Sequence, residues 1–304
     1  MLAMTAPMAT TEVGRIELGP TDRIALIAGS GQLPVDVAEG LAKAGKPPFV
    51  IAVGGQAVEP AAFQPYEHVT LPLEALGDLV PLLKRNRITH LVLAGGVSNR
   101  PNLRRIKWSL SLLRFLSKLV YMLAKGDNAL LSALVSHLEK DGFKVVGAHE
   151  IVPDLLARQG VLGKTQPLAA DWRDIDAALE AALAIGRLDI GQAAIAVGGR
   201  AIALEGVEGT DALLERTKGL RSNGRIAGIK RGVLVKCAKP GQELRADLPT
   251  IGPNTIERAH AAGLAGVAVE AERALVLEFG KTIDLADKLG LFVIGLDKVA
   301  NDER

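Results

Sequence analysis

The chain has 304 residues, which predicts about two domains, and 48% of its residues are hydrophobic, too many for a disordered chain. Aromatic residues make up only 3%, which argues against modules that stack on nucleic-acid bases, and the net charge of +2 gives no strong field for polyanions. The single cysteine, Cys237, excludes an intramolecular disulfide framework and indicates a reducing compartment, and we expect it to be a packing residue.

Residues 1–21 are expected to form a disordered extension, because they lack the basic and then apolar segments of a secretion signal. No run of 18 apolar residues is present, and the best candidate is interrupted by Lys118 and Lys125. We therefore expect a cytoplasmic protein with an N-terminal domain over residues 22–165 and a C-terminal domain over residues 166–304.

The first half alternates strands and helices, which predicts a Rossmann-like parallel sheet. Strands are expected at residues 23–28, 48–53, 68–71, 90–94 and 143–147, and helices at residues 35–44, 76–84 and 128–140. Three strands end in glycine, at Gly29 and Gly31, at Gly54 and Gly55, and at Gly95 and Gly96. Parallel strands end at a common edge where ligands bind, although glycines also make tight turns without a ligand. We interpret this edge as one wall of a ligand cleft.

The first glycine turn, Gly29-Ser30-Gly31, precedes Leu33 and a helix whose N–H groups would face an anion. The pattern stops at Gly-x-Gly, because Pro34 and Asp36 follow, so it supports dinucleotide binding only weakly. A dehydrogenase also needs an acidic residue about 20 residues beyond the turn, and residues 50–55 offer none.

Residues 99–125 interleave cations with apolar side chains, the cations being Arg100, Arg104, Arg105, Lys107, Arg114 and Lys118. Such a helix can lie on an anionic membrane surface, or cover acyl chains or a partner subunit. An ordinary amphipathic helix on the sheet, with a solvated basic face, fits the pattern equally well. After the next strand, His149 and Glu150 are candidates for proton transfer, or for purely structural hydrogen bonds.

The second half predicts a mixed α/β domain. Helices are expected at residues 174–186, 211–220, 256–262 and 283–289, and strands at residues 193–197, 201–205, 233–235, 266–269, 274–277 and 292–295. Two of these strands flank Gly198-Gly199 and predict a β-hairpin. Glu205, Glu208 and Asp211 follow, and they can hold a divalent ion, while Thr210 or Asp211 can simply cap the next helix.

The least ordinary stretch is residues 232–255. Its strand ends at Lys236, and Lys239 follows before a Pro-Gly turn. Asp247 then opens a stiff Asp-Leu-Pro-Thr-Ile-Gly-Pro segment, after which Asn254 or Thr255 is expected to cap a helix from about Ile256. Two cations and one rigidly held carboxylate suit a phosphorylated ligand with a metal ion. The alternative is an edge loop with solvated charges.

Several motifs, in order, resemble the LpxI-type UDP-2,3-diacylglucosamine pyrophosphatases. They are IAGSGQLP at residues 27–34, KDGFKVVGAHE at 140–150, LDIGQ at 188–192, EGTD at 208–211, VKCAKPGQ at 235–242 and DLPTIGP at 247–253. The resemblance covers the chain from about Arg23 onward. It implies two domains with the ligand between them, and a Mg2+-dependent hydrolase of Gram-negative lipid A biosynthesis at the cytoplasmic face of the inner membrane. It also implies cleavage to UMP and 2,3-diacylglucosamine 1-phosphate (lipid X).

The resemblance further implies that Asp247 is the essential aspartate, which binds Mg2+ or orients water. Glu208 and Asp211 are further candidates for metal contact. The residues expected to contact the substrate are Gly29, Ser30, Gly31, Leu33, Gly54, Gly55, Gly95, Gly96, Gln192, Thr210, Asp211, Lys236, Lys239, Gln242 and Thr250. Peripheral contact with an anionic membrane and a homo-oligomer stay open, no nucleic-acid partner is expected, and the alternative function is a two-domain nucleotide-sugar or lipid-binding protein without chemistry.

Overall fold

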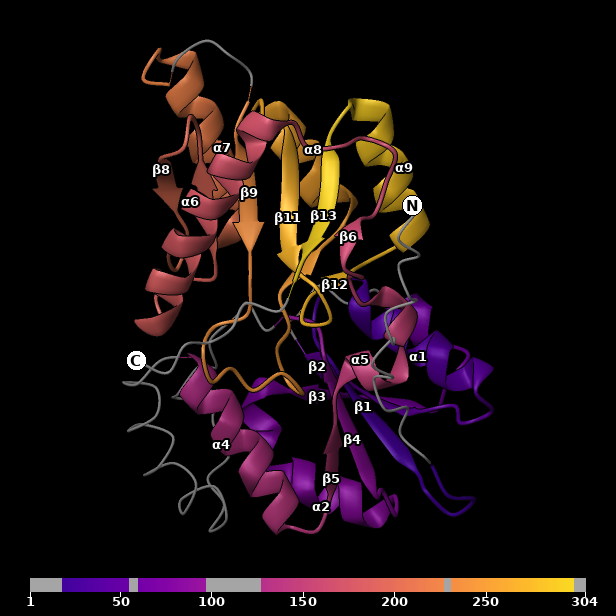
Figure 1. Ribbon diagram of the computed structural model, residues 1–304. Helices are drawn as coiled ribbons and strands as arrows, with labels where there is room; N and C mark the ends of the chain where they lie inside the picture. Colours follow the sequence, from indigo (N-terminus) through magenta and orange to yellow (C-terminus); the bar gives the residue numbers. More distant parts are fainter. Residues whose placement is uncertain (1–17, 55–59, 97–126, 227–230, 298–304) are drawn as a thin grey trace, which may run out of the picture.

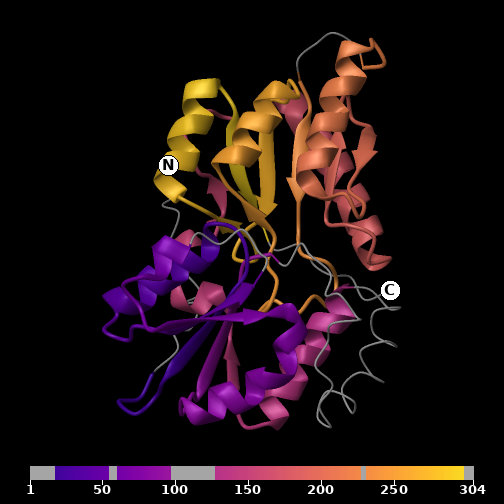
Figure 2. The ribbon, with the colours of Figure 1, turned by 180° about the vertical axis from the view of Figure 1, so that it is seen from behind.

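The computed structural model describes residues 18–54, 60–96, 127–226 and 231–297. They form two α/β units, one above the other in Figure 1 and seen from behind in Figure 2. The basic segment at residues 99–125 and Gly55 lie outside the described residues, as do residues 1–17 of the predicted N-terminal extension.

The first unit contains a sheet of five parallel strands in the order β3-β2-β1-β4-β5. This is the strand order of a Rossmann-like half, so the predicted fold of the first domain is confirmed. Its strands are β1 (Ile24–Ala28), β2 (Phe49–Gly54), β3 (His68–Pro72), β4 (His90–Ala94) and β5 (Lys144–Val146). Its helices are α1 (Leu33–Lys43), α2 (Leu79–Arg85), α4 (Asp127–Lys140) and α5 (Ala148–Ile151), with 3-10 turns at Pro60–Phe63, Leu73–Asp78 and Pro153–Leu155.

Helices cover both faces of this sheet, because its strands are apolar on both sides. Leu83 of α2 and Leu138 of α4 are buried with one set of strand residues, and Leu41 of α1 and Ala148 of α5 are buried with the other. The sheet is therefore the middle layer of three, and only its edges remain for a ligand.

The second unit is built on a mixed sheet, which agrees with the predicted mixed α/β domain, and its strand order is β6-β13-β11-β9-β7-β8. β9, β11 and β13 are parallel, and β6 and β7 are antiparallel to their neighbours. The strands are β6 (Gly160–Val161), β7 (Ala193–Ala196), β8 (Ala201–Leu204), β9 (Val233–Lys236), β11 (Gly266–Glu270) and β13 (Phe292–Leu296). A small parallel pair, β10 (Thr250–Ile251) and β12 (Leu275–Val276), lies beside the sheet. The helices are α6 (Ala169–Arg187), α7 (Gly209–Ser222), α8 (Pro253–Ala261) and α9 (Phe279–Leu289).

The β7–β8 hairpin is confirmed, and its turn residues Gly198 and Gly199 both have positive φ, which glycine adopts most easily. Helix α6 covers one face of the sheet, and α7, α8 and α9 cover the other. Strand β6 joins this sheet at residues 160–161, a few residues before the predicted domain boundary at residue 165, and the boundary itself stays a prediction.

Several predicted helix starts are wrong. Helix α8 begins at Pro253 with Gly252 as its N-cap residue, so neither Asn254 nor Thr255 occupies the N-cap; the hydroxyl of Thr255 instead accepts the N–H of Gly252, and Pro253 supplies a helical φ at the first turn. Helices α6 and α9 each begin several residues before their predicted starts, at Ala169 and Phe279. Among the described residues, we find no helix that is long and apolar enough to cross a membrane.

We predict that Gly29→Ala destabilises the first domain by about 2–4 kcal/mol, because an added Cβ at Gly29 would lie 2.4 Å from the carbonyl oxygen of Gly96. Urea unfolding monitored by circular dichroism measures this change. Gly219→Ala is the matched control: it lies in α7 with open space around it, and alanine there should stabilise by about 0.5–1 kcal/mol. Equal stability of Gly29→Ala and the wild type would contradict the close approach of these strand ends.

Candidate functional site

The Asp247 loop, which we define as residues 237–249, leaves the second sheet at the end of β9 and leads to β10 of the small parallel pair. Gln242 is buried in this loop, with 8% of its surface exposed. Its amide oxygen accepts a hydrogen bond from the backbone N–H of Lys239 at 2.7 Å, and its amide nitrogen donates to Oδ2 of Asp247 at 2.6 Å. Gln242 therefore fixes the direction of the Asp247 carboxylate.

Lys239 lies at the start of the same loop, with its ammonium 2.7 Å from Oδ1 of Asp189. Asp189 follows α6 and has φ of 53°, a left-handed conformation that is uncommon outside glycine and asparagine. An ammonium group has three donor hydrogens, so Lys239 can contact Asp189 and a phosphate oxygen together.

Lys236 ends β9 and donates to the backbone carbonyl of Thr250 at 3.0 Å. Burial of this side chain lowers the pKa of its ammonium, and the carboxylates of Glu205, Asp247 and Asp211 oppose that shift. The Asp247 carboxylate is thus close enough to influence the Lys236 ammonium, and phosphate contact by Lys236 stays a prediction.

Glu205 organises the neighbouring part of the site. It is 5% exposed, and its carboxylate accepts the backbone N–H of Gln192 at 2.7 Å and the hydroxyl of Thr210 at 2.5 Å. Thr210 is therefore not the cap of α7, because its hydroxyl points to Glu205. The side-chain oxygen Oε1 of Gln192 is buried and has no hydrogen-bond partner among the described residues. A buried acceptor without a partner costs free energy, and a ligand or ion can satisfy it.

The other two acidic candidates have partners of their own. Asp211 accepts the side-chain amide of Asn254 at 2.9 Å and lies 3.5 Å from Nε of Arg258, and Glu208 pairs with Arg216 at 2.9 Å. In the described part of the chain, no three His, Cys, Asp or Glu side chains group as a metal cage. Metal contact by Asp247, Glu208 or Asp211 stays a prediction.

The glycine edge of the first sheet is closed by backbone hydrogen bonds. Gly29 N–H donates to Ala94 at 2.8 Å, and Ser30 and Gly96 exchange N–H···O bonds at 2.8 and 3.0 Å. The tight contact of these strand ends explains the glycines without a ligand. Leu33 begins α1 and packs on the core, and Gly54 ends β2 against Pro72. Substrate contact by these residues stays a prediction.

A cavity of ≈ 590 Å³ lies between the two units. Gln32, just before α1, lines one side, and Thr250, Ile251, Leu277 and Leu285 of the second unit line others. Thr250 is the residue that this cavity shares with the site around Lys236. We call it the interdomain cavity because Gln32 of the first unit and residues of the second unit line it, and its use as the predicted ligand cleft stays a prediction.

The remaining candidates from the sequence are Cys237 and the pair His149 and Glu150. Cys237 is 1% exposed, and burial raises the pKa of its thiol to about 12, so it is a packing residue as expected. Desolvation lowers the pKa of His149, whose Nδ1 has no partner among the described residues. Glu150 accepts the backbone N–H of Gly147 at 2.8 Å, which is the structural alternative for this residue.

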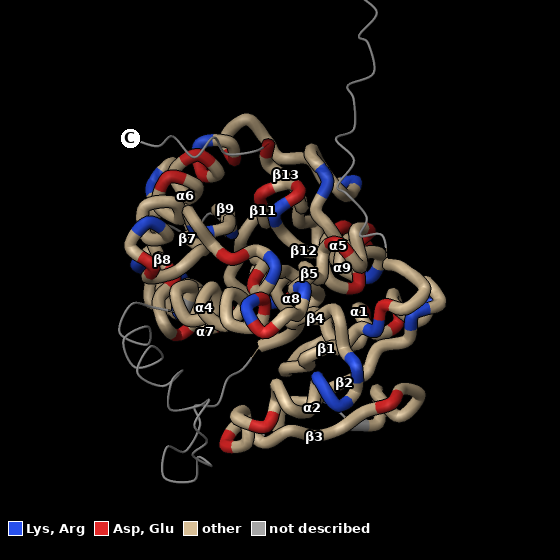
Figure 3. Tube along the Cα trace, turned by 90° about the horizontal axis from the view of Figure 1, so that it is seen from below, with Lys and Arg blue, Asp and Glu red and all other residues tan. Residues whose placement is uncertain are grey.

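Sequence reasoning missed the role of Glu205, Asp189 and the amide clamp of Gln242. Gly191 lies so close to the backbone of Glu205 that a Cβ added to it would be 2.4 Å from the Glu205 carbonyl oxygen. The Leu-Asp-Ile-Gly-Gln segment alone does not reveal this contact. Lys, Arg, Asp and Glu are interleaved along the described trace of both units (Figure 3), which agrees with the small net charge. Anion binding at Lys236 and Lys239 stays a prediction.

The chain matches two family models and one named protein. Residues 23–155 match the model described as LpxI N-terminal domain, and residues 158–294 match LpxI C-terminal domain. UDP-2,3-diacylglucosamine pyrophosphatase LpxI of Caulobacter vibrioides is 40% identical over 276 residues, which cover 90% of this chain and 98% of that protein. A crystal structure of isoflavone reductase is 12% identical and covers 91% of this chain and 78% of its own, with a TM-score of 0.26, too low to support an argument.

We predict that Cys237 in the folded protein reacts with iodoacetamide at pH 8 at least ~100-fold more slowly than in urea, because its thiol is buried and its pKa is raised to about 12. Mass spectrometry of timed samples measures the modified fraction. Since this is the one cysteine in the chain, the unfolded protein is its own control. Rapid modification under native conditions would contradict the placement of the strand end.

Proposed function

Because the chain belongs to the LpxI family, we propose that it hydrolyses the pyrophosphate of UDP-2,3-diacylglucosamine to UMP and 2,3-diacylglucosamine 1-phosphate. The observation that supports this most directly is the Asp247 loop. It holds the Asp247 carboxylate on a buried amide, in the electrostatic environment of the partly desolvated Lys236 ammonium. A diphosphate ester needs both features, positive charge for its oxygens and a fixed acidic group for water or metal.

Mg2+ is the metal that we propose for this site. It takes oxygen ligands, keeps several waters and often needs only one or two carboxylates plus substrate phosphates, so a three-carboxylate cage is not required. Asp247 and the unpartnered Oε1 of Gln192 are the protein oxygens that we propose would hold it. When bound, Mg2+ would stabilise negative charge on the phosphate oxygens.

The chain's own residues supply the rest of the reaction. Water adds to one phosphorus while the bond from that phosphorus to the bridging oxygen breaks, and the bridging oxygen leaves with the other phosphate. Lys236 and Lys239 offset the charge of the phosphates, and Asp247 orients the water or holds the ion. Gln242 keeps the carboxylate in place, and Glu205 keeps Gln192 and Thr210 in place.

The diacylated sugar needs an apolar environment. Ile251, Leu277 and Leu285 line part of the interdomain cavity, which meets the site at Thr250, and we propose that it receives part of the lipid. Each buried CH2 contributes about 0.8 kcal/mol. We also propose that the protein works peripherally at the cytoplasmic face of the inner membrane, where such a lipid is found.

We predict that Asp247→Asn lowers kcat for UMP release by about 1,000-fold or more in the presence of Mg2+, because the fixed negative charge is lost. Binding of the substrate and the circular dichroism spectrum should stay close to wild type, since Gln242 can still hydrogen-bond the new side chain. Asp284→Asn, at an exposed position of α9, is the matched control and should keep full activity. Wild-type turnover by Asp247→Asn contradicts the role of Asp247. If the wild-type protein binds the substrate and releases no UMP, the binding-protein alternative is correct.

We predict that the protein floats with vesicles that contain anionic phospholipid at low salt, and that 0.5 M NaCl releases it. The salt would release it because dissolved ions screen the attraction between exposed charges within a distance of about 10 Å or less. The reason is the run of cations within the apolar segment at residues 99–125. Flotation with neutral phospholipid is the control. Absence from the anionic vesicles at low salt would contradict the peripheral location.

A further inference from the structure

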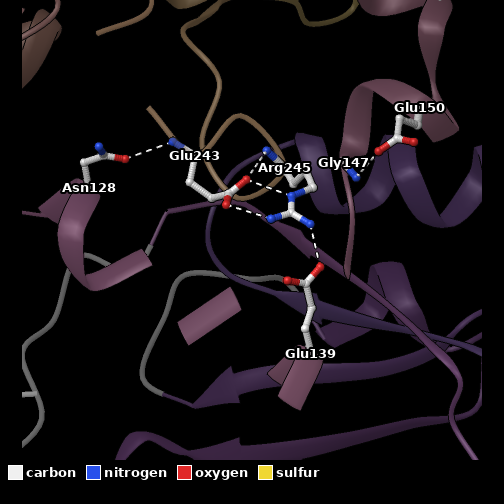
Figure 4. Close-up of polar contacts among 6 residues, drawn as sticks. All are labelled: Asn128, Glu139, Gly147, Glu150, Glu243 and Arg245. Carbon is white, nitrogen blue, oxygen red and sulfur yellow. Dashed lines mark hydrogen bonds and ion pairs between the residues drawn. The ribbon is translucent and has the colours of Figure 1, made fainter. Parts of the chain in front are cut away.

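The Asp247 loop belongs to the second unit by its chain connection, but its middle lies against the first unit. In Figure 1 it descends from β9 to the N-terminal end of α4. Three separate contacts tie it there, two through hydrogen bonds drawn in Figure 4 and one through apolar packing. Asp247, on which the proposed function depends, follows directly after these contacts.

The first contact is made by Asn128, in the first turn of α4. Its side-chain amide donates to the carbonyl of Gly241 at 3.0 Å and accepts the backbone N–H of Glu243 at 2.9 Å. One side chain thus satisfies a donor and an acceptor of the loop backbone on both sides of Gln242. Because Gln242 holds Asp247, the position of Asn128 is transmitted to the carboxylate.

The second contact is made by Glu139, near the end of α4. Its carboxylate accepts from Nη1 of Arg245 at 2.6 Å, while Nε and Nη2 of Arg245 bind both oxygens of Glu243 at 2.8 and 2.9 Å. The guanidinium is therefore held by one carboxylate from each unit (Figure 4). The hydrogen bond from Arg245 lowers the pKa of Glu243, so this carboxyl stays ionised near neutral pH.

The third contact is Ala246, which packs against the apolar core that α2 and α4 share with the first sheet. The backbone carbonyl of Glu243 accepts hydrogen bonds from the backbone N–H groups of Ala246 and Asp247, each at 3.0 Å, so residues 243–247 form one hydrogen-bonded turn. This turn is fixed to α4 at Arg245 and to the core at Ala246. The next residue in the chain is Asp247.

We propose that Asn128, through the loop backbone around Gln242, and Glu139, through Arg245, are positioning residues for the hydrolysis, because they hold the loop that sets the place of Asp247. This inference rests on the proposed function. It gives α4 a part in catalysis although neither Asn128 nor Glu139 belongs to the site around Lys236. The class of ligand is unchanged: a diphosphate ester whose reacting phosphorus must meet a carboxylate from a loop held by both domains.

The energetics separate this role from a structural one. Glu139 and Arg245 are 39% and 35% exposed, and ion pairs with that exposure contribute little to global stability. A displacement of about 1 Å at a catalytic group, in contrast, can lower a rate by about 100-fold. Loss of the pair should therefore appear in kcat and not in the unfolding transition or in KM.

The test measures UMP release from UDP-2,3-diacylglucosamine by Glu139→Gln, Asn128→Ala and the double variant. Each single variant should lower kcat by about 10- to 100-fold, with KM within about threefold of wild type and the thermal midpoint within about 3 °C. Glu139→Asp should recover part of the loss. Glu67→Gln removes an exposed ion pair with Arg23, 2.5 Å long, within the first unit and is the matched control, expected to keep full activity.

A wild-type kcat in both single variants overturns the proposal, and so does a loss confined to KM. A fall in kcat that Glu67→Gln reproduces also overturns it, since loss of any surface pair would then suffice. Measured beside them, Asp247→Asn separates this test from that of the proposed function. If Asp247→Asn is inactive while Glu139→Gln and Asn128→Ala are fully active, the positioning role alone is contradicted. If Asp247→Asn is active, the function assigned to Asp247 is contradicted.

Discussion

The hydrogen bond from Gln242 to Asp247 is the interaction on which the rest of the site depends. A carboxylate on an irregular loop has many rotamers, and catalysis needs one of them. Here a buried amide selects it, and that amide is fixed by the backbone N–H of Lys239 on its other side. The loop is long for a connection between consecutive strands, and long ordered loops of this kind usually carry function. Its stiffness comes from its own hydrogen bonds and from the first domain, and not from regular secondary structure.

The charges around Lys236 explain why a phosphate site here needs further positive charge. The ammonium lies near three carboxylates, and its pKa is still lowered because desolvation outweighs their attraction. Glu205 is stabilised separately by Gln192 and Thr210, and Asp189 occupies part of Lys239. Lys236 and Lys239 thus face four carboxylates, and Arg258 offsets only that of Asp211, so the local charge is negative before a substrate arrives. A diphosphate would make it more negative, and a divalent cation on Asp247 would offset part of this charge, which agrees with the metal that we propose.

Sequence patterns predicted the elements whose signals are local. The parallel order of the first sheet, the hairpin around Gly198 and Gly199, and the strand that ends at Lys236 follow from apolar runs and glycines within about ten residues. Helix starts were less predictable, since α8 begins at Pro253 with a glycine N-cap in place of a polar one. The partners Asn128 and Glu139 lie more than 100 residues from the loop that they hold, and no local pattern connects them. From sequence alone, a polar residue on a helix is interpreted as exposed to solvent, and only the structure shows which residue it contacts.

The first sheet has the strand order of dinucleotide-binding proteins, yet its glycine turn is used differently. In such proteins, the turn N–H groups face a pyrophosphate at the helix N-terminus. Here the N–H groups of Gly29 and Ser30 donate to Ala94 and Gly96 of the neighbouring strand end. The first turn of α1 also carries Asp36, whose pKa is raised by burial and by the nearby Glu39 and Glu278. An anion bound at this turn would therefore lie close to these acidic side chains. These contacts favour our proposal that the diphosphate binds at the lysines of the second domain, and that the first domain contributes through α4, by holding the loop that carries the acidic residue.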